Sequence, residues 1–201
     1  MSYLYFDTET TSLIPGQICQ LAYIIDEGSA VHAKNFFFTV DAVDPGSYRV
    51  HKLSIERLAE LSGGRRFKDD AEEIHTDFAS ADIITAHNFR FDYKFIAREF
   101  ERIETPFRYK QSFCTMKHFI SRCKLGGTGR NAYKYPKLSE VGEFLKIDGG
   151  EIASLTADIF LEPTAAAHDA RYDTVLMYLC VKKALQAETD IALLDKFTKG
   201  I

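Results

Sequence analysis

The sequence has no tryptophan, only five prolines and no long hydrophobic run. Its longest apolar stretch is about seven residues, at positions 175–181, whereas about 18 are needed to cross a bilayer. The N-terminal segment reaches an acidic residue at Asp7 and lacks the basic and apolar regions of a signal peptide. These absences favour a cytoplasmic protein that makes no contact with a membrane.

Cysteine is also scarce, with four residues in the chain, and no pair has the spacing of a zinc knuckle or a C-x-x-C redox motif. We expect Cys19, Cys114, Cys123 and Cys180 to be reduced thiols. The sequence therefore predicts neither a disulfide scaffold nor a cysteine-ligated metal.

The chain lacks a large excess of charge of either sign, because its formal net charge is −4. That value excludes the strongly basic domain typical of many nucleic-acid-binding proteins. The charge is nevertheless uneven, since residues 105–139 contain no Asp or Glu and eight Lys or Arg. Tyrosines lie among these basic residues, as in proteins that follow a single-stranded backbone and stack its bases. We expect residues 126–136, with Arg130 and Lys134, to form a lid or strand guide, although a solvated basic loop is the alternative.

The chain is rich in residues that can form a hydrophobic core. Of its 201 residues 46% are hydrophobic, including 16 Phe and ten Tyr. This size suits a single domain over residues 1–201. Apolar runs predict strands at residues 3–6, 18–25, 36–40, 82–86 and 112–114. Helical periodicity predicts helices at residues 54–61, 68–79, 89–103, 138–145 and 169–185, and one that ends near residue 122. This order predicts an α/β sheet with one antiparallel strand.

Acidic side chains follow the first predicted strand. Asp7 and Glu9 are two positions apart, so both project from one face of an extended chain. Like charges held side by side repel each other unless a cation lies between them. An isolated D-x-E is more typical of a solvated strand-end turn, so this pair needs partners to indicate a metal site.

Two later segments supply those partners. Asp92 falls in the first turn of a predicted helix, where the helix dipole stabilises a carboxylate, and this could be its whole role. However, Asp92 shares a face with apolar Phe95 and Ile96, and a carboxylate on an apolar face needs a partner. Asp173 lies one turn into the last predicted helix, and His168 lies just before that helix. Four carboxylates and one histidine are suited to a site with two divalent ions, Mg²⁺ or Mn²⁺, that cleaves phosphodiesters with a histidine base.

These segments resemble the three motifs of the DEDDh (DnaQ-like) 3′→5′ exonucleases, a family that includes the epsilon proofreading subunits of bacterial DNA polymerase III. The matching segments are D-T-E-T-T from Asp7, H-N-x-x-F-D from His87 and H-x4-D from His168. The resemblance implies an RNase H-like fold with a mixed five-stranded sheet and helices on both faces. It further implies that Asp7, Glu9, Asp92 and Asp173 hold two divalent ions and that His168 is the general base.

The resemblance also implies contacts to the substrate. The positions concerned are Thr10, Leu13, His51, His87 and Phe91. His51 belongs to V-H-K-L-S, which resembles a family segment with glycine where this chain has Lys52, so the local backbone is expected to differ. The implied substrate is single-stranded or 3′-frayed nucleic acid, with DNA favoured over RNA, and a DNA polymerase is a candidate partner.

Three alternatives remain open at this point. An RNA-trimming exonuclease of the same family would carry the same motifs. A catalytically silent nucleic-acid-binding subunit would lack at least one metal ligand, and none is missing. A hydrolase of small phosphodiesters would have no need of an extended basic segment.

Overall fold

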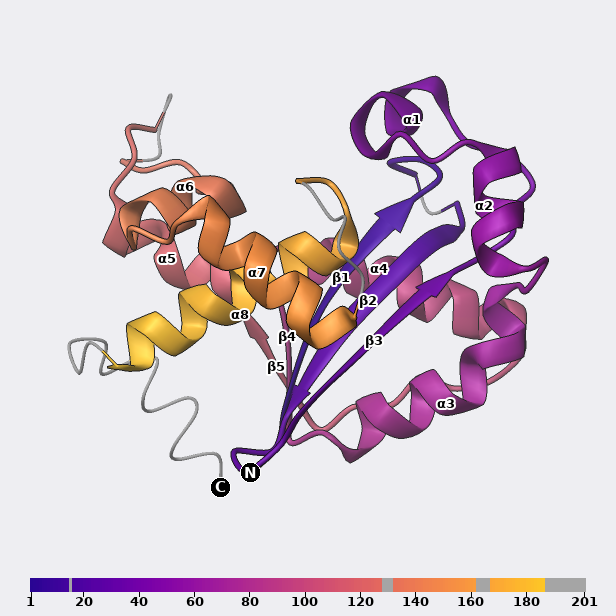
Figure 1. Cartoon of the computed structure of the whole chain (residues 1–201), viewed down its shortest axis with the longest axis horizontal. Helices are drawn as coiled ribbons and strands as arrows, with labels where there is room; N and C mark the ends of the chain where they lie inside the picture. The colour runs from indigo at the N-terminus through magenta and orange to yellow at the C-terminus, as the bar shows by residue number, and fades with distance from the viewer. Residues whose placement is uncertain (15, 128–131, 162–166, 187–201) are drawn as a thin grey trace.

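The computed structural model describes residues 1–14, 16–127, 132–161 and 167–186, which form a five-stranded sheet with helices on both faces (Figure 1). The strands are β1 (Tyr3–Thr10), β2 (Ile18–Asp26), β3 (Val31–Phe37), β4 (Ile83–Ala86) and β5 (Gln111–Cys114). Their order across the sheet is β3-β2-β1-β4-β5. Strand β2 is antiparallel to both of its neighbours, whereas β1, β4 and β5 pair in parallel. The predicted mixed sheet with one antiparallel strand is confirmed.

Eight helices surround the sheet in the described part of the chain. They are α1 (Pro45–His51), α2 (Ile55–Ser62), α3 (Phe67–Ser80), α4 (Phe89–Arg102), α5 (Thr115–Cys123), α6 (Leu138–Phe144), α7 (Gly149–Phe160) and α8 (Ala170–Gln186). The predicted helices are confirmed within two residues of their ends, and α1 and α7 are additional. Local caps define several starts; for example, the Ser54 hydroxyl accepts a hydrogen bond from Arg57 N and begins α2.

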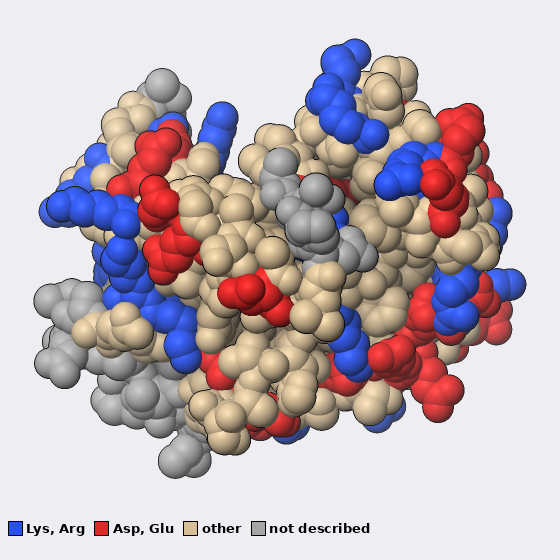
Figure 2. Space-filling view, viewed as in Figure 1, with Lys and Arg blue, Asp and Glu red and all other residues tan. Residues whose placement is uncertain are grey.

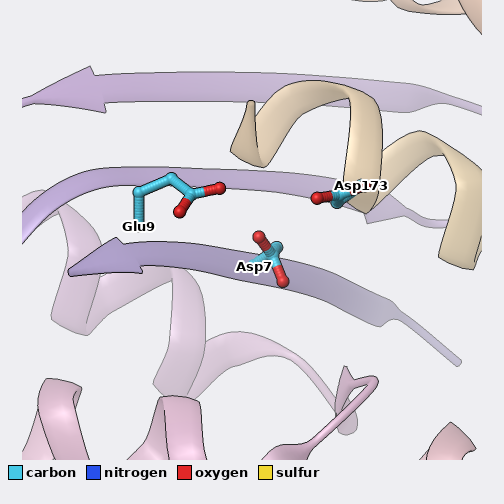
Figure 3. Close-up of side chains that lie close together, drawn as sticks. All are labelled: Asp7, Glu9 and Asp173. Atoms are coloured by element: carbon cyan, nitrogen blue, oxygen red, sulfur yellow. The ribbon is translucent and has the colours of Figure 1, made fainter. Parts of the chain in front are cut away.

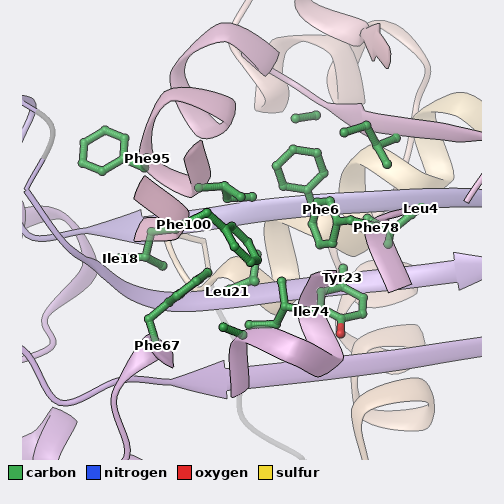
Figure 4. Packing of buried hydrophobic residues seen from close by; sticks show 14 of the residues in the cluster. Leu4, Phe6, Ile18, Leu21, Tyr23, Phe67, Ile74, Phe78, Phe95 and Phe100 are labelled. Atoms are coloured by element: carbon green, nitrogen blue, oxygen red, sulfur yellow. The ribbon is translucent and has the colours of Figure 1, made fainter. Parts of the chain in front are cut away.

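The alternation of side chains along β1 creates two cores. Leu4 and Phe6 point to one face, where they join a cluster with Ile74 and Phe78 of α3 and with Phe100 of α4 (Figure 4).

Tyr5 of β1 points to the other face of the sheet. There it packs in a second cluster with Ile24 of β2 and with residues of α8 such as Val175 and Val181. Strand β1 is therefore covered on both faces, so the side chains that follow Phe6 are held in fixed positions.

Two strand predictions differ from the structure. Strand β1 continues to Thr10, because β2 pairs with it along this whole length, so Asp7 and Glu9 lie within the strand and not after it. Strand β3 covers Val31–Phe37, where residues 36–40 were expected. The ladder with β2 runs from Asp26↔Val31 to Gln20↔Phe37, so the partner strand and not the apolar run sets its limits.

Charge is divided across the surface. In Figure 2, Lys and Arg side chains form a band down the left edge, over the region of α5, whereas acidic side chains dominate the lower right, where α3 lies. The acidic residues on α3 include Asp69, Asp70, Glu72, Glu73 and Asp77. The modest net charge is therefore an average over surfaces of opposite sign. None of the helices in the described ranges combines the length and apolarity needed to span a membrane.

Candidate active site

Three carboxylates meet at the carboxyl-terminal half of β1. Asp7 and Glu9 come from β1, and Asp173 comes from the first turn of α8, which crosses over the strand (Figure 3). One carboxylate oxygen of each lies within 4.8 Å of the others. The structure thus brings Asp7, Glu9 and Asp173 together, and their role as metal ligands stays a prediction.

The fourth acid, Asp92, approaches from the opposite side of the strand. It is 3% exposed in the first turn of α4, and its Oδ1 accepts a hydrogen bond from Thr8 Oγ1 across 2.7 Å. Thr8 lies between Asp7 and Glu9 and faces α4, because neighbouring side chains in a strand alternate. Asp92 still acts electrostatically on Asp7, so it belongs to the same charged centre.

Burial and mutual repulsion disfavour the charged forms of these acids. Burial raises the pKa of Glu9 to about 9, and Asp173 and Asp169 add to that rise. Burial also raises the pKa of Asp92 to about 7 and that of Asp173 to about 6. The pKa of Asp7 is well above its ordinary value because of burial and the charges of Asp92 and Asp173. The four acids therefore lie in surroundings that disfavour their charged forms.

That arrangement fits the divalent ions expected from the sequence. The ligand atoms are all carboxylate oxygens, which suit hard cations such as Mg²⁺ and Mn²⁺. A bound cation would favour the charged forms that burial disfavours. Asp7, Glu9 and Asp173 are placed to hold one ion in common. Asp92 is not one of the acids in this group, and its Oδ1 is hydrogen-bonded to Thr8.

His168 lies at the rim of this centre, just before α8. Its backbone is left-handed, with φ of 66°, and its N–H donates to Asp173 Oδ2 across 3.2 Å. The proximity of His168 lowers the pKa of Asp173, against the larger effect of burial. The side chain is exposed and lines the same hollow as Asp7 and Asp92, which is where a general base would have to lie.

A hollow that we call the Leu13 hollow, of about 850 Å³, contains most of the predicted substrate contacts. Its lining includes Glu9, Thr10, Leu13, His51 and Phe91. Leu13 is 82% exposed at its lip, whereas His51 is buried and its pKa is lowered by burial. The sequence therefore identified residues that do lie together, and their contact with a substrate stays a prediction.

The segment around His51 also shows how Lys52 replaces the expected glycine. Lys52 ends α1 with φ of 61° and ψ of 15°, a left-handed conformation that glycine adopts without strain. Lys52 thus adopts a conformation typical of glycine, and the expectation that the backbone differs from that of the family segment stays a prediction.

A second hollow, which we call the Tyr135 hollow, has a volume of about 770 Å³ and adjoins the first. Both are lined by Thr8 and Phe91, so these residues lie at the junction. Besides three of the acids and His168, its lining includes His87, Tyr135 and Lys137. Of the two predicted cationic contacts, Arg130 lies outside the described residues. Lys134 forms an ion pair with Glu140 across 2.5 Å and is not among the residues lining these hollows.

Sequence reasoning missed a group of supporting residues. Glu99 of α4 is 5% exposed; its Oε1 accepts hydrogen bonds from Ile18 N across 2.9 Å and from Arg102 Nη1 across 2.7 Å. Arg102 also donates to Gly16 O. These bonds, which we call the Glu99–Arg102 latch, attach the loop that carries Leu13 to α4. The loop follows a register shift in β1 between Glu9 and Thr10. An acidic residue on the apolar face of α4 is a signal that the sequence contains for both Asp92 and Glu99. The sequence analysis used this signal for Asp92 and missed Glu99.

Comparison with known proteins places this geometry in context. A family model described as an exonuclease matches residues 4–178, which include Asp7, Glu9, Asp92, His168 and Asp173. No curated protein matches the sequence.

Solved structures of exonuclease I share the fold. The zinc-bound form of E. coli exonuclease I with single-stranded DNA has a TM-score of 0.72 and 17% identity, over 97% of this chain and 42% of that chain. The E. coli enzyme with a dT13 oligonucleotide gives 0.70 and 17%, over 98% and 43%. A moderately thermophilic exonuclease I from Methylocaldum szegediense gives 0.65 and 17%, over 96% and 42%. The predicted RNase H-like exonuclease fold is confirmed, and the chain spans less than half the length of these proteins.

Proposed function

The chain belongs to the exonuclease family whose model it matches, and on that basis we propose that it removes nucleotides from the 3′ end of single-stranded or frayed DNA, releasing nucleoside 5′-monophosphates. The proposed polarity follows from the DEDDh motif set. The preference for a single strand is supported by the neighbouring structures, some of which contain single-stranded oligonucleotides. We also propose that residues 1–201 form one exonuclease domain.

The observation that carries the proposal is that carboxylate oxygens of Asp7, Glu9 and Asp173 lie within 4.8 Å of one another. Asp92 acts electrostatically on Asp7. Two divalent ions, when bound, would activate the attacking water and stabilise the leaving 3′ oxygen. The four carboxylates would hold these ions beside β1. Thr8 keeps the Asp92 carboxylate oriented through its 2.7 Å hydrogen bond.

In this proposal His168 accepts the proton from the attacking water. An imidazole is suited to this task because its pKa lies close to neutral pH. Asp173 accepts a hydrogen bond from the His168 backbone, so the base and an acid of the charged centre are held in one local structure. The exposed side chain of His168 can exchange its proton with solvent after each cycle.

The Leu13 hollow is proposed to receive the terminal nucleotide. It offers the apolar side chains of Leu13 and Phe91 for a base, and Thr10 and His51 for polar contacts. We also propose that the substrate is DNA in preference to RNA and that a DNA polymerase is a candidate partner.

Digestion of end-labelled oligonucleotides tests this function. Single-stranded DNA, duplex DNA and RNA, each labelled at the 3′ or the 5′ end, would be incubated with Mg²⁺, Mn²⁺ or EDTA. We expect immediate release of 3′ label as mononucleotide and gradual shortening of 5′-labelled single strands. Full activity in EDTA would contradict the metal-dependent site, and faster trimming of RNA would transfer the proposal to an exoribonuclease. His168→Ala should reduce kcat by about 10²–10⁴-fold.

A further inference from the structure

The basic segment 105–139 is divided by the fold into parts with different surroundings. Lys110 precedes β5 and bonds to Ser80 O and Asp82, beside the amino end of β4 and away from the acidic centre. Lys134 is paired with Glu140. By contrast, Tyr135 and Lys137 line the hollow that contains Asp7 and Asp173. Of the basic residues of this segment that the structure describes, Lys137 alone lines the hollow with the acids.

This end of the segment belongs to a hairpin-like arm. Gly126 and Tyr133 form an antiparallel bridge, and Lys134 N donates to Leu125 O across 3.0 Å. Beyond the bridge, Tyr135 is 57% exposed, although it lies against the hollow. An exposed aromatic ring beside a cation is the arrangement that single-strand-binding proteins use to stack a base and contact its phosphate.

A partly buried histidine fixes the position of this arm. His87 Nε2 donates to Pro136 O across 3.0 Å, because a carbonyl oxygen can only accept. His87 Nδ1 then accepts from the Thr115 hydroxyl, also across 3.0 Å. Both ring nitrogens are thus engaged within the protein, so a polar contact between His87 and a substrate would break one of these bonds.

The two hollows would hold different nucleotides of a bound strand. The Leu13 hollow contains the residues proposed for the terminal nucleotide and is lined by Glu9, whereas Asp7, Asp92 and Asp173 line the Tyr135 hollow, so acids lie on both sides of the junction. A strand whose scissile phosphate lies at the acids must continue into the second hollow, because the first is occupied by its end.

We propose that Tyr135 and Lys137 form a subsite for the nucleotide on the 5′ side of the scissile bond, and that His87 is a positioning residue that holds this subsite in place. The proposal rests on the proposed exonuclease function. The base stacks on the Tyr135 ring, and Lys137 contacts the phosphate backbone. Stacking is tolerant of sequence, so the subsite selects an unpaired strand and not a particular base.

Two substrates separate this subsite from the reaction itself. The first is (dT)8, which fills the Tyr135 hollow; the second is the p-nitrophenyl ester of thymidine 5′-monophosphate, in which nitrophenolate replaces the upstream nucleotide as leaving group. We expect Tyr135→Ala to raise KM for (dT)8 about 10-fold and to leave kcat/KM for the ester unchanged. Tyr135→Phe should retain wild-type KM, because the ring remains. Tyr133→Ala is the matched control, since Tyr133 is 39% exposed on the same arm but does not line the hollow.

The role of His87 is tested through the same measurements. His87→Ala should raise KM for (dT)8 as Tyr135→Ala does, and the double variant should be no worse than the worse single variant, because both act on one subsite. Lys137→Met should lower the slope of log KM against log salt by about one, whereas Lys117→Met on α5 should not.

The outcomes are distinct. If Tyr135→Ala and the wild type have equal KM for (dT)8 while both cleave the ester, the subsite is refuted and the exonuclease function stands. If the wild type cleaves neither substrate with Mg²⁺ or Mn²⁺, the proposed function fails. A loss of ester cleavage in folded His87→Ala would place His87 in the reaction and would overturn its assignment as a positioning residue.

Discussion

The side-chain amide of Gln20 donates a hydrogen bond to Asp169 Oδ1 across 3.0 Å and so joins strand β2 to the residue that precedes α8. Gln20 Oε1 also accepts from Ala170 N. Asp169 is held from the other side by Arg171, whose Nη2 lies 2.6 Å from Asp169 Oδ2. Gln20 is paired with Glu9 across the ladder, so this contact sets the start of α8 relative to the acids on β1.

Replacing Gln20 should therefore disturb both stability and turnover. Gln20→Leu leaves the Ala170 N–H and the Asp169 carboxylate without this partner, and we expect a loss of about 1–3 kcal/mol in the free energy of unfolding. Because Asp173 and His168 move with the start of α8, kcat should fall by about 10–100-fold. Urea unfolding and single-turnover kinetics measure the two effects. Asn35→Ala, which removes a different partner of Gln20, should leave kcat close to that of the wild type.

The stability of the metal-free protein should depend on pH with an unusual sign. Glu9, Asp92 and Asp173 have folded-state pKa values of about 9, 7 and 6, above their ordinary values. The folded protein therefore binds more protons than the unfolded chain from about pH 4 to pH 9, and its stability should fall as pH rises through this range. Thermal unfolding in EDTA between pH 5 and 9 measures this. Added Mg²⁺ should raise the Tm more at pH 8 than at pH 5, and an equal rise at both would contradict a carboxylate metal site.

Removing one acid should separate stability from activity. Asp7→Asn removes a buried acid whose charged form is disfavoured by burial and by the charges of Asp92 and Asp173, so the metal-free variant should resist higher urea concentrations than the wild type at pH 8. The same change should abolish Mg²⁺-dependent digestion. Asp158→Asn, on the exposed face of α7, serves as the control and should alter neither. A destabilised Asp7→Asn protein would show that the carboxylate has a structural partner.

The Glu99–Arg102 latch offers a comparison within one helix. Glu99→Gln removes the charge that holds Arg102 and weakens the attachment of the loop bearing Leu13, so KM should rise and stability should fall by about 1–3 kcal/mol. Glu101→Gln breaks the pair with Arg98, which has the same spacing but is exposed, and should change stability by less than about 1 kcal/mol. Equal effects of the two changes would remove the case for a latch.

Lys52 provides a test of backbone strain alone. Lys52→Gly should raise the free energy of unfolding by about 1 kcal/mol, since glycine adopts the left-handed conformation at φ of 61° without a Cβ clash. Lys52→Asn should have an intermediate effect, because asparagine tolerates this region better than lysine. Denaturation curves at neutral pH check the order of the three proteins. A lower stability for the glycine variant would mean that its added unfolded-state entropy exceeds the strain.

Local sequence signals predicted those parts of the fold where side-chain periodicity and burial coincide. Helix α3 and strand β2 were predicted nearly to the residue for this reason. Helices α1 and α7 were missed because they begin with Pro45-Gly46 and with Gly149-Gly150, which interrupt an apolar pattern. The Asp148 side chain caps α7 from outside, and so a helix forms where composition disfavours one.

The acids of the site were predictable, and the contacts that support them were not. The spacing of Asp7 and Glu9 along an extended strand fixes a common face, and this requires no knowledge of the rest of the chain. The bonds from Thr8 to Asp92 and from Gln20 to Asp169 depend on how β1, α4 and α8 pack. Such long-range contacts leave no periodic signal in a single sequence.

The distance in sequence between Asp7 and Asp173 has a consequence for synthesis in the cell. Strand β1 is made first, and α8, which completes the acidic centre on it, is the last helix in the described chain. The ribosome therefore releases three of the four acids well before the fourth, and the proposed base His168 also arrives late. Under the proposed function, neither an unfinished chain nor a degradation fragment without α8 is expected to cleave nucleic acid.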